Sequence, residues 1–282
     1  MPDKWKRKRW SEGWISSRPD WQDSTINRLA ASILDENLAH QTRDVAPPRL
    51  SHLINAQKEI GNNLEKNRSA RLKAIERAVE NLITSPLYEY RTKNGYHAVP
   101  GTGNPQARIM FIGEAPGKQE ALSGKPFVGA AGKFLDKLLE SVYLDRQQIF
   151  ITNILKDRPP DNRAPQRREI ELYTPFLRRQ IEIIQPEVIV TLGRFAMEFI
   201  FAELNMPEQG GKISELHGHT LRAKTSYGEV IVLPLFHPAV SLYRRDLKEV
   251  LENDFQALQA YGENERAASH GDSLIINRNI PH

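Results

Sequence analysis

Short apolar runs alternate with helical patterns from about residue 86 onward, and this alternation constrains the fold most strongly. Four of these runs are rich in Ile and Val, as are strands buried on both faces of a sheet. They occupy Arg108–Ile112, Ile149–Asn153, Val188–Leu192 and Val230–Leu235. Helical patterns follow at about residues 130–142, 166–184, 194–204 and 246–261. Because such alternation is typical of parallel sheets covered by helices, we predict an α/β fold: an α/β/α sandwich with a central four-stranded, mainly parallel sheet, preceded by a helical N-terminal extension.

The first hundred residues differ in composition from the rest of the chain. All four tryptophans lie within the first 21 residues, among lysines and arginines. Such a segment could contact phosphates and stack on bases, or its aromatic side chains could dock on the surface of the main domain. We expect a basic, Trp-rich extension over residues 1–48, a helical segment over 49–85 that packs on the core, a main domain over 86–261 and a polar tail over 262–282.

The composition excludes several classes of site. Without cysteine, the chain can form no disulfide, thiolate metal site, cysteine-ligated iron–sulfur cluster or cysteine nucleophile. The sequence also lacks the phosphate-binding loop of NTPases and the His-x-Glu signature of zinc deaminases. No apolar run is long enough to span a membrane and no signal peptide is evident, so we expect a cytoplasmic protein. The net charge of +4 permits binding to a polyanion without requiring it.

A glycine-rich segment, residues 113–132, joins the first predicted strand to a helix. An open parallel sheet holds its ligand at the carboxyl ends of its strands, and glycines let backbone N–H groups approach that ligand closely. Phe127 adds a flat apolar face for a planar ring. The same composition would also suit a structural turn. Asn153, Gly193 and His237 lie at the ends of the other three predicted strands, so we expect all these residues at one edge of the sheet.

Five motifs then occur in the order found in a known family. They are Gly-Glu-Ala-Pro-Gly at 113–117, Gly-Lys-Pro-Phe-Val-Gly at 124–129, Ile-Thr-Asn at 151–153, Arg-Pro-Pro-Asp-Asn-Arg-Ala-Pro at 158–165 and His-Pro-Ala at 237–239. Over about residues 80–260 the sequence resembles the uracil-DNA glycosylase superfamily, and most of all its family 4. The resemblance implies an enzyme that rotates a pyrimidine nucleotide out of DNA and hydrolyses the bond between base and sugar.

The resemblance assigns base binding to Gly113, Ala115, Phe127 and Asn153. Phe127 would stack on the base, and the amide of Asn153 has both a donor and an acceptor for a uracil edge. That amide can also reverse and face a cytosine edge. These residues therefore do not separate uracil from a modified cytosine.

Catalysis is assigned to Glu114 and His237, together with Asn153. A neutral or positively charged His237 would stabilise the negative charge that develops on the departing base. Glu114 would position the attacking water and offset the positive charge on the sugar. Ala115 stands where the best-known family of the superfamily has a water-activating aspartate, so proton abstraction by that side chain is excluded here.

Two further segments are predicted to contact DNA. The proline-rich loop 158–165 carries Arg158 and Arg163, which would clamp the DNA backbone, although the loop could also be a plain rigid connection. In the segment 240–245, either Leu242 or Tyr243 would wedge into the vacated stack. Its basic residues would contact phosphates; they are Arg244 and Arg245.

Members of family 4 usually ligate a [4Fe–4S] cluster through four cysteines. Alignment of the flanking residues places Leu82, Ser85, Asp157 and Tyr173 at those positions, so we expect no cofactor and no metal. We expect packing and hydrogen bonds to replace the cluster, with Leu82 and Tyr173 in an apolar contact and Asp157 and Ser85 bonded nearby.

Our first hypothesis is a monofunctional, monomeric DNA glycosylase whose partner is DNA, with uracil as its default base. The main alternative keeps the reaction but changes the target to a bulky modified cytosine in phage DNA, such as glucosylated hydroxymethylcytosine, as an antiviral defence. A second alternative is a DNA-binding protein without catalytic activity, which retention of Glu114, Asn153 and His237 disfavours.

Overall fold

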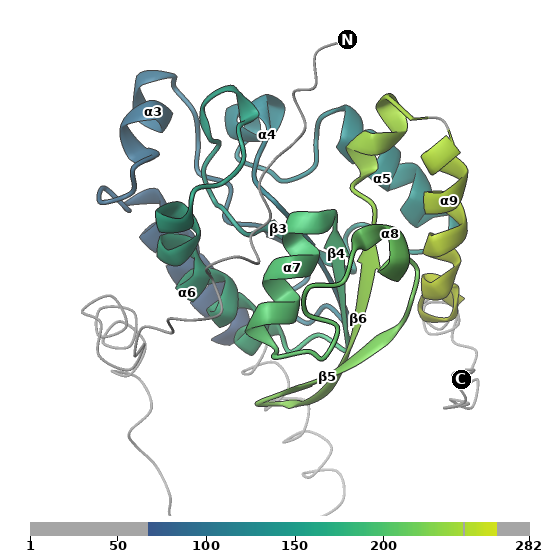
Figure 1. Cartoon of the computed structure of the whole chain (residues 1–282). Helices are drawn as coiled ribbons and strands as arrows, with labels where there is room; N and C mark the ends of the chain where they lie inside the picture. The colour runs from purple at the N-terminus through teal and green to yellow at the C-terminus, as the bar shows by residue number, and fades with distance from the viewer. Residues whose placement is uncertain (1–66, 245, 264–282) are drawn as a thin grey trace, which may run out of the picture. The chain divides into compact units, whose positions relative to one another are not determined.

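A six-stranded sheet forms the centre of the computed structural model, which describes residues 67–244 and 246–263 (Figure 1). The strand order is β1-β3-β2-β4-β6-β5. The predicted extension at residues 1–48 and nearly all of the predicted tail at 262–282 lie outside the described residues.

The four strands in the middle of the sheet are those expected from the sequence. They are β2 (Ile109–Gly113), β3 (Phe150–Asn153), β4 (Val188–Leu192) and β6 (Gly228–Leu235). Each pairs in parallel with its neighbour in the order β3-β2-β4-β6. Parallel pairing brings all four carboxyl ends to one edge, which confirms the expected α/β class and its mainly parallel sheet.

The sheet has six strands rather than four, because a short antiparallel strand is added at each edge. β1 (Thr102–Gly103) pairs with β3, and β5 (Leu221–Thr225) pairs with β6. β1 has only two residues, and β5 buries only Ala223. Neither carries the run of Ile and Val that marks a strand buried on both faces, so the sequence pattern missed both.

Helices cover both faces of the sheet (Figure 1). α5 (Ala130–Ser141) and α9 (Asp246–Phe255) lie on one face, where they pack in one apolar cluster with alternate residues of β2 such as Phe111. α6 (Arg167–Ile184) and α7 (Arg194–Glu203) lie on the other face. Because side chains alternate along a strand, the buried Met110 and Ile112 point toward that second pair of helices.

Shorter elements connect these layers. They are a helix at residues 67–80, α3 (Tyr88–Lys93), α4 (Lys118–Ser123), α8 (Ile213–Leu216) and the 3-10 turns η2 (Pro160–Asn162), η3 (Pro238–Leu242) and η4 (Gln256–Leu258). Among the described helices, none combines the length and the apolar character needed to cross a membrane.

Candidate functional site

The predicted site residues follow the carboxyl ends of the parallel strands. Gly113 ends β2 and is the register partner of Asn153, which ends β3. Gly193 follows β4, and its N–H donates to the carbonyl of Leu235 at the end of β6 (2.8 Å). His237 comes two residues later. Four chain segments that are distant in sequence thus meet at one edge of the sheet.

Gly113 lies in close contact with both Asn153 and Phe127. A Cβ atom at position 113 would be 2.4 Å from Oδ1 of Asn153 and 2.8 Å from Cζ of Phe127. Both side chains are buried, at 2% and 6% exposure. The absence of a side chain at Gly113 therefore allows an amide and an aromatic ring to meet over the end of β2.

The ring of Phe127 is held by its own backbone. Phe127 has a φ of +51°, a left-handed conformation that is uncommon for a bulky residue. Its carbonyl accepts a hydrogen bond from Nη2 of Arg146 (3.0 Å), while Nη1 of Arg146 binds Asp136 (2.6 Å). A Cβ at Gly132 would be 1.9 Å from the same carbonyl oxygen, so helix α5 starts directly against this turn. These contacts stabilise the strained conformation that aims the ring.

Glu120 fixes the two loop residues that follow Phe127. Its Oε1 accepts hydrogen bonds from the backbone N–H groups of Val128 (2.9 Å) and Gly129 (2.8 Å). Two charge-assisted bonds to consecutive backbone groups fix the loop between α4 and α5. No sequence pattern marks Glu120 or Arg146 as a supporting residue.

The ring of His237 lies beside the ring of Phe127. The centroids of the two rings are 5.5 Å apart, and the ring planes are inclined by 29°. A Cβ at Gly193 would lie 3.1 Å from Cβ of His237, and φ at Gly193 is +91°. Glycine at this position thus permits both the turn after β4 and the close approach of His237.

The protonation state of His237 follows from its surroundings. Burial lowers the pKa of its imidazole from 6.5 to about 4, against a smaller opposing effect of Glu120. Its Nδ1 accepts a hydrogen bond from the backbone N–H of Ala239 (3.1 Å). The ring is therefore neutral at pH 7 and carries its proton on Nε2, which leaves that nitrogen as a donor.

Glu114 and Ala115 continue the chain directly from Gly113. Both are half-buried, and the carbonyl of Glu114 accepts a hydrogen bond from the N–H of Leu155 (3.1 Å). This bond extends the contact between the segments that follow β2 and β3. The backbone of Glu114 is thereby fixed next to Gly113, against which Phe127 and Asn153 lie.

Two of the arginines predicted to bind DNA are engaged within the protein. Arg158 donates to Oη of Tyr96 and to Oδ1 of Asn162, each at 2.8 Å. Arg163 forms two hydrogen bonds with the fully buried carboxylate of Glu169, at 2.9 and 2.5 Å. Both arginines therefore stabilise the loop that carries them, and their contact with DNA stays a prediction.

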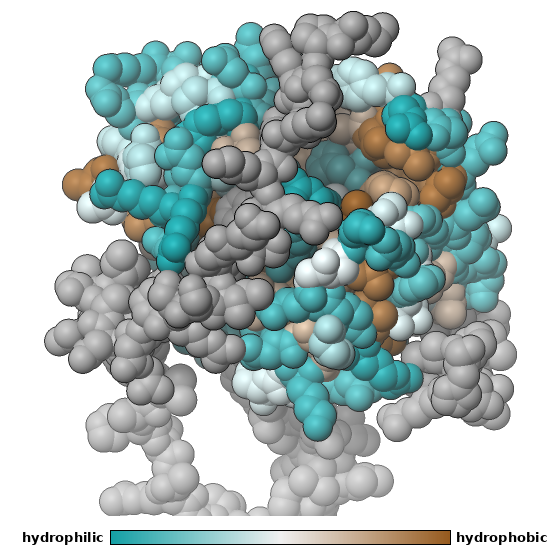
Figure 2. All heavy atoms as spheres, viewed as in Figure 1, coloured by the Kyte–Doolittle hydropathy of each residue, from teal (hydrophilic) through white to brown (hydrophobic). Residues whose placement is uncertain are grey.

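The other predicted DNA contacts lie on and after η3. Leu242 is 49% exposed and Tyr243 is 85% exposed. Figure 2 shows hydrophobic residues gathered on the surface over this turn. Arg244 forms an ion pair with Asp246 (2.6 Å), and Arg245 lies outside the described residues.

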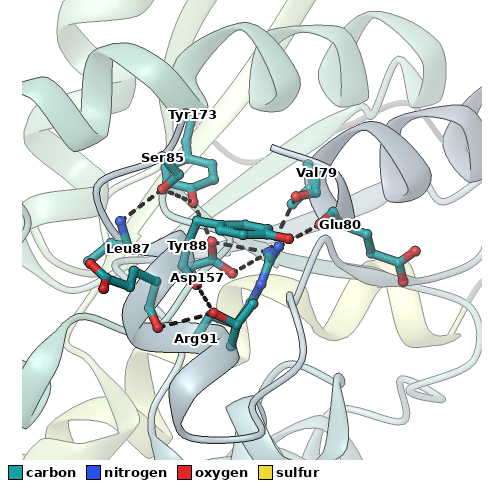
Figure 3. Close-up of polar contacts among 10 residues, drawn as sticks. Val79, Glu80, Ser85, Leu87, Tyr88, Arg91, Asp157 and Tyr173 are labelled. Carbon is teal, nitrogen blue, oxygen red and sulfur yellow. Dashed lines mark hydrogen bonds and ion pairs between the residues drawn. The ribbon is translucent and has the colours of Figure 1, made fainter. Parts of the chain in front are cut away.

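A buried hydrogen-bond network joins three of the four positions at which the family resemblance places cysteines (Figure 3). The hydroxyl of Tyr173 lies 2.7 Å from Oγ of Ser85 and donates to Oδ2 of Asp157 (2.5 Å). The guanidinium of Arg91, a residue that the sequence analysis missed, donates to both carboxylate oxygens of Asp157 (2.9 and 3.2 Å). Tyr173 is thus held through its hydroxyl. Leu82 is half-buried, and its apolar contact with Tyr173 stays a prediction.

This network does not fit an iron–sulfur cluster. Its side chains are a hydroxyl, a phenol, a carboxylate and a guanidinium, none of which is a thiolate ligand. Within the described ranges, no three His, Cys, Asp or Glu side chains are grouped so as to hold a metal ion. Arg91 also donates to the carbonyl oxygens of Val79 (3.3 Å) and Glu80 (2.5 Å). The network therefore ties the segment before β1 to the loop after β3 and to α6.

Comparisons with known proteins agree with this arrangement. Residues 100–259 match the family model described as "Uracil DNA glycosylase superfamily". The chain is 44% identical over 190 residues to a type-4 uracil-DNA glycosylase of Sulfurisphaera tokodaii, covering 66% of this chain and 84% of the relative. It is 46% identical over 169 residues to a type-4 uracil-DNA glycosylase of Archaeoglobus fulgidus, covering 60% and 83%. The chain therefore belongs to the uracil-DNA glycosylase superfamily, a family of DNA N-glycosylases.

Proposed function

We propose that this DNA N-glycosylase releases uracil from DNA by hydrolysing the bond between the base and the sugar, leaving an abasic site. One observation carries the proposal: Phe127 and Asn153 both lie against Gly113, and His237 faces Phe127 with a ring-centroid distance of 5.5 Å. An aromatic face, an amide and an imidazole donor are thereby presented together. A flipped uracil has a planar face for the aromatic ring, an N3–H and O4 edge for the amide, and O2 for the imidazole donor.

Base recognition follows from the first two of these groups. The amide of Asn153 pairs with N3–H and O4 of the uracil edge, since it has one donor side and one acceptor side. Phe127 stacks on the base, and such stacking contributes about 1–3 kcal/mol. This free energy offsets part of the cost of unstacking the nucleotide, which is on the order of a few kcal/mol.

Bond cleavage uses the donor of His237. As the bond between N1 and C1′ breaks, its electron pair leaves with the base, and negative charge develops on O2 of uracil. The neutral imidazole donates its Nε2–H to that oxygen, and this bond strengthens as the charge grows. Water adds to C1′ under the orientation of Glu114, and the proton that the water loses is balanced by protonation of the uracil anion.

The experiment that tests the function is a single-turnover assay on matched duplexes that contain uracil, cytosine or thymine at one position. Phage DNA with glucosylated hydroxymethylcytosine serves as the parallel substrate. Release of free uracil from the uracil duplex alone is the expected result. Release from the modified phage DNA alone would replace uracil by a bulky cytosine, and tight DNA binding without any base release would indicate a protein that only binds DNA.

We expect this enzyme to be a monomer, and we expect it to act in the cytoplasm. Both statements rest on the sequence analysis. Sedimentation of the free protein and of its complex with DNA tests the first of them.

A further inference from the structure

Lys156 is a fully buried lysine that has no role in the site described above. Its ammonium donates three hydrogen bonds, to Oγ1 of Thr152 (2.6 Å), to the carbonyl of Asn153 (2.8 Å) and to Oε1 of Gln180 (2.7 Å). All three acceptors are neutral, and no ion pair of Lys156 occurs among those of the described residues. Burial lowers the pKa of its ammonium well below the ordinary value.

A buried lysine at this position destabilises the fold. Moving an ammonium out of water costs several kcal/mol even after the surroundings relax, and neutral acceptors recover only part of that cost. An unbranched apolar side chain of similar length would fill the same space without the penalty. The role of Lys156 should therefore lie in the groups that its ammonium binds.

The peptide group that follows Asn153 is held from both sides. Lys156 binds its carbonyl oxygen, and its N–H, which belongs to Ile154, donates to the carbonyl of Gly113 (2.9 Å). This peptide plane therefore cannot rotate without loss of one of the two bonds. The Asn153 amide itself lies against Gly113, so the backbone and the side chain of Asn153 are fixed in one direction.

The other two acceptors anchor the ammonium to the rest of the fold. Oγ1 of Thr152 and Nε2 of Gln180 both donate to the carbonyl of Pro100, at 2.8 and 2.7 Å. The backbone carbonyl of Lys156 accepts from the N–H of Val99 (2.7 Å). Lys156 thus connects the end of β3 to α6 and to residues 99–100, and each polar atom in this small cluster has a partner.

We propose that Lys156 is a positioning residue for base recognition: it fixes the backbone at Asn153 so that the amide faces the edge of the flipped base. The inference rests on the proposed function, because it assigns Asn153 to the base. It predicts that Lys156 acts on the reaction through Asn153 and through no other group.

A double-mutant cycle tests this inference, because residues that act through one another have non-additive effects. The variants are Lys156→Met, Asn153→Ala and the double variant, assayed in the full chain by single-turnover release of uracil. We expect Lys156→Met to lower the rate at least 10-fold in the native background and less than twofold in the Asn153→Ala background. It should also reduce the preference for free uracil over free cytosine as an inhibitor of the reaction, because these two bases differ at the edge that the Asn153 amide reads.

Gln180→Met is the matched control for a merely structural effect. It removes an acceptor of the same ammonium and a donor to Pro100, but it leaves the bond between Lys156 and Asn153 in place. We expect a loss of thermal stability, with the preference for free uracil over free cytosine as an inhibitor retained. If Lys156→Met does not fold, Lys156→Gln keeps a donor amide with a shorter reach and should show an intermediate loss of this preference.

Equal losses from Lys156→Met in both backgrounds, or no loss in either, would overturn the inference. Failure of the proposed function is distinguished from this outcome by the native chain. If that chain releases another base instead of uracil, the same cycle is measured on that base.

Discussion

The rings of His237 and Phe127 face one another with centroids 5.5 Å apart, although the two residues are distant in sequence. Phe127 is carried by the loop before α5, and His237 follows the last parallel strand. The parallel order of β2, β4 and β6 brings these two segments together. The site is therefore a consequence of topology, and each ring has its own glycine contact, Gly113 for Phe127 and Gly193 for His237.

Replacement of His237 by alanine should remove the donor to O2 of the departing base. Loss of one such donor typically lowers the rate by about 10²–10³-fold. Affinity for uracil-containing DNA should change little, because the bond strengthens only as charge develops. Single-turnover rates and binding isotherms measure the two effects, and His219→Ala, at an exposed histidine outside the site, is the control. Equal losses of binding and rate would contradict the role given to His237.

The pH dependence of the reaction should reflect a neutral imidazole. Because the pKa of His237 lies at about 4, the neutral donor form persists from pH 8 down to about pH 5. We therefore expect no loss of single-turnover rate with an apparent pKa between 6 and 7. A loss of rate as the pH rises through that range, absent from His237→Gln, would show that the charged imidazole is the active form.

The same lowered pKa affects stability. A histidine that titrates at about 4 in the folded chain and at about 6.5 when unfolded binds its proton first in the unfolded state. Its contribution to stability is complete above pH 6.5 and is lost as the pH falls from 6.5 toward 4. The urea midpoint should fall over this range more steeply for the native chain than for His237→Gln. Parallel midpoints for the two proteins would contradict the lowered pKa of His237.

Gly113→Ala should disable base recognition while the fold persists. Its Cβ would overlap Oδ1 of Asn153 and the ring of Phe127, so at least one of these side chains must move. A displacement of about 1 Å at a catalytic centre can cost 10²-fold in rate, and we expect a loss of this size. Gly210→Ala is the control: φ is +85° there, but no atom lies within 4 Å of the added Cβ. It should cost stability without loss of rate, and full activity of Gly113→Ala would refute the close contact.

Arg163 should contribute to stability through Glu169. The carboxylate of Glu169 is fully buried and also accepts a hydrogen bond from the N–H of Gln166 (2.7 Å) at the start of α6. Arg163→Ala leaves that charge without its cation. Since Arg163 is itself 34% exposed, we discount the usual cost of breaking a buried pair to about 2 kcal/mol. Urea unfolding measures this loss, with the exposed Arg168→Ala as control. An unchanged midpoint with weaker DNA binding would instead make Arg163 a DNA contact.

Arg91 should have a larger effect on stability than Arg163. Arg91 and Asp157 are 6% and 0% exposed, so Arg91→Met leaves a buried carboxylate with Tyr173 as its remaining side-chain partner in the network. Breaking a buried pair by removal of one partner costs about 3–5 kcal/mol. The double variant Arg91→Met with Asp157→Asn should be less destabilised than Arg91→Met alone. A greater loss in the double variant would contradict the pairing.

The parts of this protein that could be predicted from the sequence are those with a local residue pattern, such as an apolar run or a motif. The central strands could be located because runs of Ile and Val are buried on both faces, and Asn153 and His237 stand in motifs at strand ends. Arg91 and Lys156 could not be assigned, because an isolated cationic residue is usually solvated. Asp157 lies 66 residues from Arg91 and Gln180 lies 24 residues from Lys156, so only the folded chain brings these partners together.

The most direct test of the central claim is the identity of the base released by the full chain in excess over a duplex with a single uracil. We predict free uracil in solution and an alkali-labile abasic site in the strand, with neither product from the matched cytosine and thymine duplexes. A uracil strand that stays intact after prolonged incubation with excess protein would contradict uracil excision by this chain.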